Sequence, residues 1–146
     1  MKNIFINKLP DQYYFVDKSS IKPEEIIELQ LSVGWGRDSL ECWQSCIDNS
    51  IATIGVRDSN DKLVGAAFLA GNLRHAVICD LTVNPDHQFK GIGGAIMFKI
   101  MDKISEMDIP FIYTELVETN PFREKILQSG FKVTGGSLFM DVFEAN

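Results

Sequence analysis

The chain has 146 residues, of which 45% are apolar and 23% charged, an ordinary composition for a globular protein. This length favours one domain over residues 1–146 with one sizeable core. The formal charge is −6 at neutral pH, which disfavours binding of nucleic acid through bulk electrostatic attraction. A cationic amine would be drawn toward such a surface, which gives weak support for an amine as a partner.

The sequence has no apolar run of the roughly 18–20 residues needed to cross a bilayer. Its first residues lack the apolar segment and the small-residue cleavage site of a signal peptide, so we expect a cytoplasmic protein with no membrane partner. Cys42, Cys46 and Cys79 fit a reducing compartment. No second Cys/His pair stands at metal-ligand spacing, so we expect structural cysteines and no metal site.

The N-terminal half predicts two extended stretches, two helices and a hairpin. The extended stretches are Asn3–Asn7 and Gln12–Asp17, separated by a Pro-Asp turn. Capping residues, an early proline and two acids start a helix near Pro23 that stops at a glycine-rich turn. A second helix runs from Ser39 to about Asn49. The hairpin strands are Ile51–Val56 and Leu63–Ala70, joined by a polar turn.

The C-terminal half predicts alternating strands and helices around one long amphipathic helix. This helix runs from Gly91 to about Met107, with apolar residues at helical spacing. A strand precedes it, another follows it, and a short helix then ends at Gly130, a predicted C-cap. The remaining predicted elements are the strands His75–Val83, Ile109–Val117, Phe131–Val133 and Leu138–Phe143 and the helix Pro121–Ser129. The whole order predicts a mixed α/β sheet with helices on both faces.

The segment Leu81–Gly94 places three glycines in the first turn of the long helix, directly after a strand and a turn. A helix start presents free backbone N–H groups and the positive end of its dipole, which together form an anion site. Glycine removes the side chains that would keep a phosphate away from those groups. The spacing matches neither the dinucleotide GxGxxG motif nor a P-loop. Taken alone, the glycines also fit a tight turn beside a close-packed helix.

The residues Gln88-Phe89-Lys90-Gly91-Ile92-Gly93, with Val83-Asn84-Pro85 just upstream, fit the pattern Q/R-x-x-G-x-G/A. This segment resembles the acetyl-CoA pyrophosphate motif of the GNAT superfamily of N-acetyltransferases. The resemblance is strongest over residues 78–107 and continues through Ser129-Gly130-Phe131. It implies a mostly antiparallel sheet with splayed central strands, acetyl-CoA as cosubstrate, and a primary amine of a small molecule or peptide as acceptor. A homodimer follows by analogy only.

The resemblance also implies a cosubstrate site. The strand before the loop would pair with the pantetheine arm, as in β-augmentation, and the loop amides would hold the pyrophosphate. Thr119 and Asn120 compete for the position of the family's coenzyme A-contacting asparagine, since the spacing to Gly130 is one residue short. The implied cofactor-binding residues are Leu81, Thr82, Val83, Gln88, Phe89, Lys90, Gly91, Ile92, Gly93, Gly94 and Asn120.

Three carboxylates are candidates for the base that deprotonates the amine. Asp80 lies in an apolar run beside the pantetheine site, where desolvation would raise its pKa; a structural aspartate is the alternative. Glu115, on the strand after the long helix, stands near a catalytic glutamate of some family members. Glu118 is expected to be a solvated charge. A backbone N–H of Val83 or its neighbours would polarise the thioester carbonyl.

The family's usual acid, a tyrosine in Y-x-x-x-G-F, is absent because Ile126 stands at that position. Solvent, a bound water, or the hydroxyl of Tyr113 or Ser129 would have to protonate the thiolate, or the protein is a slow or degenerate member. Trp35, between the first two helices, is a candidate acceptor-binding residue through stacking, or a lid over the core. His75 and His87 are expected to be structural. Two further hypotheses are a non-catalytic acyl-CoA sensor and an adaptor that uses the fold for protein contacts.

Overall fold

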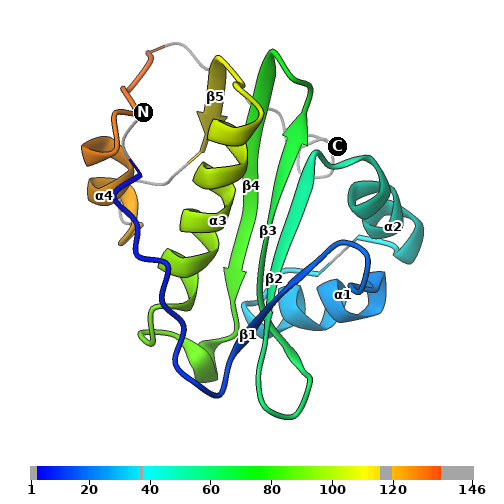
Figure 1. Cartoon of the computed structure of the whole chain (residues 1–146). Helices are drawn as coiled ribbons and strands as arrows, with labels where there is room; N and C mark the ends of the chain where they lie inside the picture. Colours follow the sequence, from blue (N-terminus) through cyan, green and yellow to red (C-terminus); the bar gives the residue numbers. More distant parts are fainter. Residues whose placement is uncertain (1–2, 37, 116–119, 136–146) are drawn as a thin grey trace.

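The computed structural model describes residues 3–36, 38–115 and 120–135. Within them the chain forms five strands, four α-helices and one 3₁₀ turn, drawn in Figure 1. In chain order the elements are β1 (Tyr14–Asp17), α1 (Pro23–Ser32), α2 (Leu40–Asn49), β2 (Ala52–Arg57), β3 (Leu63–Gly71), β4 (His75–Val83), η1 (Pro85–His87), α3 (Ile92–Glu106), β5 (Phe111–Thr114) and α4 (Arg123–Gln128).

The five strands form one sheet in the order β1-β2-β3-β4-β5. The first four pair antiparallel, and β5 joins β4 in parallel. A parallel neighbour needs a crossover connection, and α3 supplies it. The predicted α/β fold with a mixed, mostly antiparallel sheet is therefore confirmed.

Helices cover both faces of the sheet, as predicted, and each face has its own apolar cluster. On one face α3 and α4 lie against the sheet, and on the other α1 and α2 do (Figure 1). The α3 residues predicted at helical spacing are all at most 2% exposed. They are Ile92, Ile96, Met97, Ile100 and Ile104. The opposite cluster centres on Ile26 and Leu29 of α1, Trp43 and Ile47 of α2, and Phe68 of β3.

The helix ends follow the capping residues that the sequence offers. Glu25 in the first turn of α1 accepts a hydrogen bond from the Lys22 N–H at 3.0 Å, and Ser39 caps α2 by accepting from the Cys42 N–H at 3.2 Å. Gly91 caps α3 in the left-handed conformation, with φ 85°. Gly130 follows α4 with φ 111°, which agrees with its predicted role as a C-cap.

Two predicted strands are not strands. Residues 3–7 run irregularly because the Asn3 side chain replaces a strand partner, donating to Phe98 O of α3 at 3.0 Å and accepting from the Phe5 N–H at 3.2 Å. Residues 131–133 are also irregular, and Phe131 packs against the cluster on the α3 face. The predicted strand 138–143 lies outside the described residues.

Candidate functional site

One edge of β4 is open over its second half. Parallel pairing with β5 begins at His75 and Phe111 and ends at Ile78 and Thr114. Beyond Ile78, no strand among the described residues pairs with β4 on this side. Among the described residues, the pairing between β4 and β5 therefore ends at Ile78, and the edge of residues 79–83 on this side has no strand partner.

Strand alternation fixes which groups face that edge. The Asn84 N–H bonds Val64 O of β3 at 2.8 Å, so Asn84 points toward β3. Since successive residues of a strand point their N–H and C=O groups to opposite edges, those of Val83 and Leu81 point away from β3. Gln88 agrees with this assignment, because its Nε2 reaches Val83 O at 3.0 Å from outside the β3–β4 ladder.

A β-bulge interrupts β4 at Asp80. The pairing with β3 shifts between Thr82 opposite Ala66 and Cys79 opposite Phe68, so Asp80 and Leu81 together face the single residue Ala67. Asp80 has φ 55°, a left-handed conformation that is uncommon outside glycine and is tolerated best by Asn and Asp. Bulges of this kind re-aim a side chain and are frequent beside active sites.

The Asp80 carboxyl lies in partly desolvating surroundings although the residue keeps contact with solvent. Burial raises the pKa of Asp80, the Cys79 thiol lowers it by hydrogen bonding, and the Asp38 charge raises it further, with a net shift upward. The neighbouring Cys79 thiol is held protonated, since burial and then the Asp80 charge raise its pKa to about 12. The predicted upward shift at Asp80 is confirmed in direction.

A pocket of about 310 Å³ opens beside Asp80. Its walls come from the C-terminal half of α2, from β3 and from the bulge of β4, and no lysine or arginine of the described residues contributes to them. The polar lining groups include Asp80, Ser45 and Asn49, and the apolar wall includes Phe68. We call this cavity the α2–β4 pocket. Its place beside an exposed carboxylate makes it a candidate acceptor site.

Six consecutive amides at the start of α3 have no hydrogen-bond acceptor among the described residues. They belong to residues 89–94; the next amide along, that of Ala95, bonds Gly91 O at 3.0 Å and begins the helical ladder. Free N–H groups at a helix start attract an anion. Along the chain, residues 84–88 connect the open edge of β4 to this row of donors.

The three glycines of this row meet three different requirements. Gly91 has φ 85°, which a side chain would strain. At Gly93 a Cβ would come within 2.7 Å of the Phe122 ring. The absence of a side chain at this glycine therefore lets Phe122, which precedes α4, pack against α3. At Gly94 a Cβ would meet nothing within 4 Å. The expectation that glycine keeps the approach to the amides clear therefore fits Gly94, whereas Gly93 has a packing reason.

Two side chains that the sequence analysis did not identify hold the loop before α3 and the end of β4. The Tyr13 hydroxyl lies 2.8 Å from His87 Nδ1, and Gln30, buried on α1, donates to Thr82 Oγ1 at 3.1 Å. His87 therefore has a structural contact, as predicted. The signal for Gln30 was a polar residue on the buried face of α1, whereas nothing local marked Tyr13. Its partner is 74 positions away in the chain.

The other predicted site residues belong to separate parts of the fold. Glu115 directly follows β5 and is exposed, at the level where pairing with β4 stops. Asn120 accepts from the Phe122 N–H at 2.9 Å and so starts the turn into α4. Trp35 is 56% exposed and follows α1, but it does not line the α2–β4 pocket. Thr119 and Glu118 lie outside the described residues.

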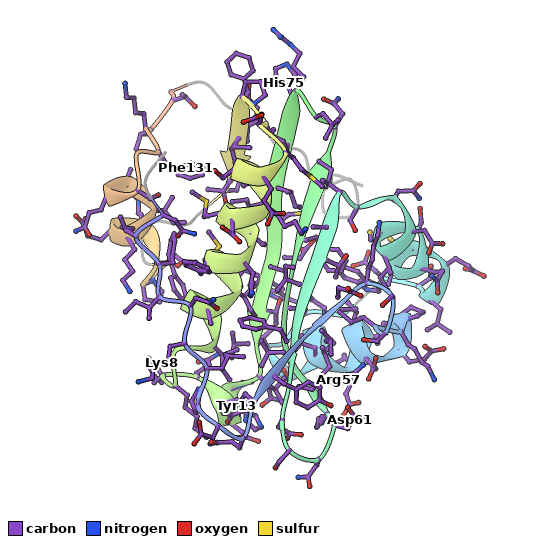
Figure 2. The ribbon with its side chains drawn as sticks, in the orientation of Figure 1. Lys8, Tyr13, Arg57, Asp61, His75 and Phe131 are labelled. Carbon is purple, nitrogen blue, oxygen red and sulfur yellow. The ribbon has the colours of Figure 1, made fainter. Side chains whose placement is uncertain are left out.

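Neither hydroxyl considered as a proton donor to the leaving thiolate is well placed. Ser129 is buried and donates to Ile126 O at 2.6 Å. Tyr113 lies 3.4 Å from His75 Nδ1, at the start of β4, and five residues of strand separate His75 from Asp80, or about 16 Å. Figure 2 places His75 at the opposite end of the sheet from Tyr13. Ile126 is a core residue, 4% exposed.

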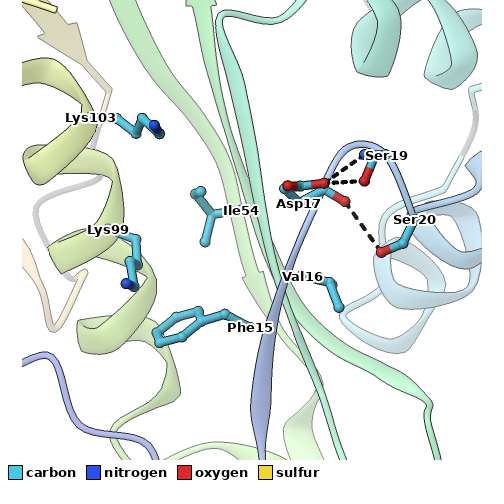
Figure 3. A pocket seen from close by; sticks show the side chains of 8 residues that line it. All are labelled: Phe15, Val16, Asp17, Ser19, Ser20, Ile54, Lys99 and Lys103. Carbon is cyan, nitrogen blue, oxygen red and sulfur yellow. Dashed lines mark hydrogen bonds between the residues drawn. The ribbon is translucent and has the colours of Figure 1, made fainter. Parts of the chain in front are cut away.

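A larger cavity, of about 430 Å³, lies between β1, β2 and α3 (Figure 3). Its charged groups already have partners: Lys103 bonds Glu106 at 3.0 Å, and Lys99 lies 5.1 Å from the centre of the Phe15 ring. Asp17 accepts from the Ser19 N–H and hydroxyl. The free amides and Asp80 are not part of it, so it is not the candidate site.

The site can be compared with known proteins. Residues 20–131 match the model of the acetyltransferase (GNAT) family. The chain belongs to this family. It is therefore a GNAT acetyltransferase, and the predicted resemblance is confirmed.

Curated relatives of this GNAT chain carry general names. It is 30% identical over 120 residues to an uncharacterized N-acetyltransferase, ycf52, of Pyropia yezoensis, covering 76% of this chain and 69% of the relative. It is 31% identical over 106 residues to a ycf52-like N-acetyltransferase of Prochlorococcus marinus, covering 68% and 58%. The chain thus spans somewhat over half to about two thirds of the length of these relatives.

Solved structures share the fold. A GNAT-family acetyltransferase from Streptococcus pneumoniae superposes with a TM-score of 0.73 at 21% identity, covering 89% of this chain and 98% of that one. The ribosomal-protein-S18-alanine N-acetyltransferase of Escherichia coli superposes with a TM-score of 0.67 at 15% identity, covering 80% and 75%. In the part of the chain that the structure describes, no helix combines the length and the apolar character needed to cross a membrane.

Proposed function

We propose that this GNAT acetyltransferase binds acetyl-CoA along the open edge of β4 and the free amides of residues 89–94, and transfers the acetyl group to a primary amine. One observation carries the proposal: within the part of the chain that the structure describes, an unpaired strand edge and a row of free helix-start amides are joined by one short loop. The first ends at Val83 and the second begins at Phe89, and the Gln88 side chain joins them through its bond to Val83 O at 3.0 Å.

Each row suits a different part of acetyl-CoA. The pantetheine arm contains amides that extend the sheet when they pair with the outward groups of Leu81 and with the N–H of Val83, whose C=O already accepts from Gln88. The diphosphate is an anion that the amides of residues 89–94 and the positive end of the α3 dipole stabilise. Lys90 adds a cation at the same helix start. The cosubstrate then lies between β4 and β5, with its thioester near Asp80.

In the proposed reaction the amine attacks the acetyl carbon directly in a ternary complex. The nitrogen–carbon bond forms, negative charge collects on the carbonyl oxygen, and an N–H directed to the open edge from Val83 or Leu81 stabilises that charge. The carbon–sulfur bond then breaks and coenzyme A leaves as a thiolate. The products are the acetylated amine and coenzyme A, with no covalent enzyme intermediate.

Asp80 is the proposed base that takes the proton from the attacking amine, directly or through water. Its support is its place on the bulge, its contact with the α2–β4 pocket, and a pKa that burial shifts toward the working range of a base. Glu115, exposed at the parting of the strands, is the second candidate. Ile126 has no ionisable proton, and the hydroxyls of Ser129 and Tyr113 are poorly placed. In this scheme water therefore protonates the thiolate.

The acceptor proposed for the α2–β4 pocket is a compact cationic amine. The pocket volume of about 310 Å³ suits a small molecule or one terminal residue of a peptide. Among the described residues, its wall contains the Asp80 carboxylate and no lysine or arginine, and the chain as a whole carries a charge of −6. Both features attract an ammonium group before it loses its proton.

Calorimetry and a thiol-release assay test the proposal together. We expect acetyl-CoA and CoA to bind the purified protein, and we expect CoA release that depends on an added amine. A panel of amines and alcohols with matched carbon skeletons separates nitrogen from oxygen acceptors. The absence of heat with either nucleotide at millimolar concentration would contradict the proposal.

A second candidate function is a non-catalytic acyl-CoA sensor. The observation that favours it is the apolar Ile126 at the position where the family usually places its acid. In that case the protein would bind acetyl-CoA tightly, while no amine of the panel would accelerate thiol release. Amine-dependent turnover would exclude it.

A further inference from the structure

The hydroxyl of Tyr13 joins the two ends of the loop that begins α3. The Tyr13 side chain is almost buried, at 7% exposure, and its Oη lies 2.8 Å from His87 Nδ1 and 3.4 Å from Lys90 Nζ. An ammonium group can only donate, so Tyr13 accepts from Lys90 and directs its own proton to His87. This one hydroxyl therefore contacts both η1 and the residue before Gly91.

A carboxylate lies on the other side of the same histidine. With Nδ1 accepting, His87 carries its proton on Nε2, and this atom lies 3.9 Å from Asp58 Oδ2. Asp58 is itself fixed in the β2–β3 turn, where its Oδ1 accepts from the N–H groups of Asn60 at 2.9 Å and Lys62 at 3.0 Å. We call Tyr13, His87, Lys90 and Asp58 the Tyr13 network.

The N-terminal part of this arrangement lies outside the match to the family model, which begins at residue 20. Figure 2 shows Tyr13 and Lys8 at the same end of the molecule, where the N-terminal segment passes the start of α3. Lys8 O would lie 3.9 Å from a Cβ at Gly91. The segment before β1 thus contacts the loop through Tyr13 and passes near Gly91 at Lys8.

We propose that Tyr13 is a positioning residue for the diphosphate of acetyl-CoA, acting through Lys90 and His87; this inference rests on the proposed binding of acetyl-CoA. The hydroxyl holds the Lys90 ammonium beside the free amides and fixes η1, so that the donors of residues 89–94 are arranged before the ligand arrives. Preorganisation of this kind increases affinity because less ordering is left to the binding step.

The test compares Tyr13→Phe with Tyr14→Phe. Both changes remove one tyrosine hydroxyl with one or two hydrogen bonds, but the Tyr14 hydroxyl donates to Asp61 in the β2–β3 turn and, among the described residues, bonds neither His87 nor Lys90. We expect Tyr13→Phe to weaken CoA binding about three- to ten-fold by calorimetry, and Tyr14→Phe to leave it within about two-fold. Thermal unfolding of both variants shows whether they are folded.

A truncated cosubstrate separates positioning of the diphosphate from a general structural effect. S-acetylpantetheine lacks the diphosphate, and the slope of rate against its concentration gives kcat/KM without saturation. We expect Tyr13→Phe to lower kcat/KM for acetyl-CoA about three- to ten-fold and to leave that for S-acetylpantetheine unchanged. In a Lys90→Met background, the effect of Tyr13→Phe on CoA affinity should shrink, because the two residues act together.

Equal losses with both cosubstrates would overturn the inference, since they would indicate a structural role for the hydroxyl. Unchanged CoA affinity in Tyr13→Phe, or an equal loss in Tyr14→Phe, would also overturn it while the proposed function stands. If the unaltered protein binds neither CoA nor acetyl-CoA, the proposed function fails, and this inference fails with it.

Discussion

Asp80 combines an unusual backbone conformation with an unusual electrostatic environment. Its φ of 55° is part of a bulge in β4, and burial raises the pKa of its carboxyl. Both features reduce stability, one through backbone strain and the other through desolvation of a charge. Residues that are costly to the fold in this way are frequent at catalytic sites.

We therefore predict that Asp80→Asn separates activity from stability. Asparagine accepts a positive φ and carries no charge, so the thermal midpoint at neutral pH should rise or stay unchanged. If Asp80 is the base, kcat should fall about 10²- to 10⁴-fold. Differential scanning calorimetry and steady-state kinetics on the same preparation give both quantities. An unchanged kcat would show that Asp80 is not the base and would leave Glu115 or water in that role.

The pH dependence of the unaltered protein follows from the same shift. A base must be unprotonated, so activity should fall as the pH drops through a pKa that lies above the ordinary value of 3.8. Because the folded-state pKa is raised, the contribution of Asp80 to stability decreases as the pH rises from 3.8 to that value and is constant above it. Comparing the acid limb of kcat with the unfolding midpoint over this interval checks both statements.

The glycines of α3 give a prediction with opposite outcomes at adjacent positions. Gly94→Glu places a charge in open space beside the free amides, so the protein should remain folded and lose CoA binding at least about 100-fold. Gly93→Ala places a methyl group 2.7 Å from the Phe122 ring, so it should destabilise the fold by about 1–3 kcal/mol. Calorimetry with CoA and denaturant unfolding of each variant distinguish the two effects.

At the scale of elements, one ion pair ties α1 to the β2–β3 hairpin. The Arg57 guanidinium is 7% exposed and meets the Glu25 carboxylate at 2.5 and 3.0 Å. It also donates to Ser20 O at 2.8 Å and to Asp61 O at 3.0 Å. Gln30 of α1 bonds Thr82 of β4, so this pair contributes to holding α1 against the strand beside the site.

We predict that Glu25→Gln destabilises the protein by about 3 kcal/mol at neutral pH, because it leaves a nearly buried guanidinium with only the more distant, exposed carboxylate of Asp61, at 3.6 Å. The hydrogen bond from Arg57 lowers the pKa of Glu25, so this stabilisation is present above the ordinary value of 4.5 and is lost as the pH falls through the lowered one.

Glu28→Gln is the matched control on the same helix. Its pair with Lys62, at 3.1 Å, is more than half exposed on the Glu28 side and should change stability by less than about 1 kcal/mol. Urea unfolding at pH 7 and again at a pH well below 4.5 should show the difference between the two variants shrinking at the lower pH. A difference that is constant over this range would contradict the ion-pair explanation.

Elements with strong local signals could be predicted from the sequence, and elements that depend on distant partners could not. The β4 strand was predicted with its observed bounds, His75–Val83, and α3 within one residue at each end, because both have clear periodicity and turns. Residues 3–7 have the composition of a strand, but their backbone is satisfied by Asn3 and α3. Such tertiary contacts override local propensity.

At the scale of the whole molecule, the parts of the candidate site that are contiguous in the chain could be predicted, and the parts that come from distant segments could not. The glycine loop and Gln88 are contiguous in the chain, so their relation to β4 and α3 could be read from the sequence. The Tyr13 network and the α2–β4 pocket bring together residues from distant segments, which no local pattern reveals. The bulge was also hidden, since the register against β3 is a property of two strands.

The register of β4 has one more consequence. Ile78 on one side of the bulge and Leu81 and Val83 on the other all pack on the α3 face, although their numbering breaks the alternation of two. A chain lacking Asp80 would restore that alternation, with Leu81 alone opposite Ala67 and every apolar side chain still on its own face. The carboxylate beside the α2–β4 pocket thus belongs to the extra residue of the bulge, and the strand would be more regular without it. We expect a shortened chain to fold well and, if Asp80 is the proposed base, to acetylate poorly.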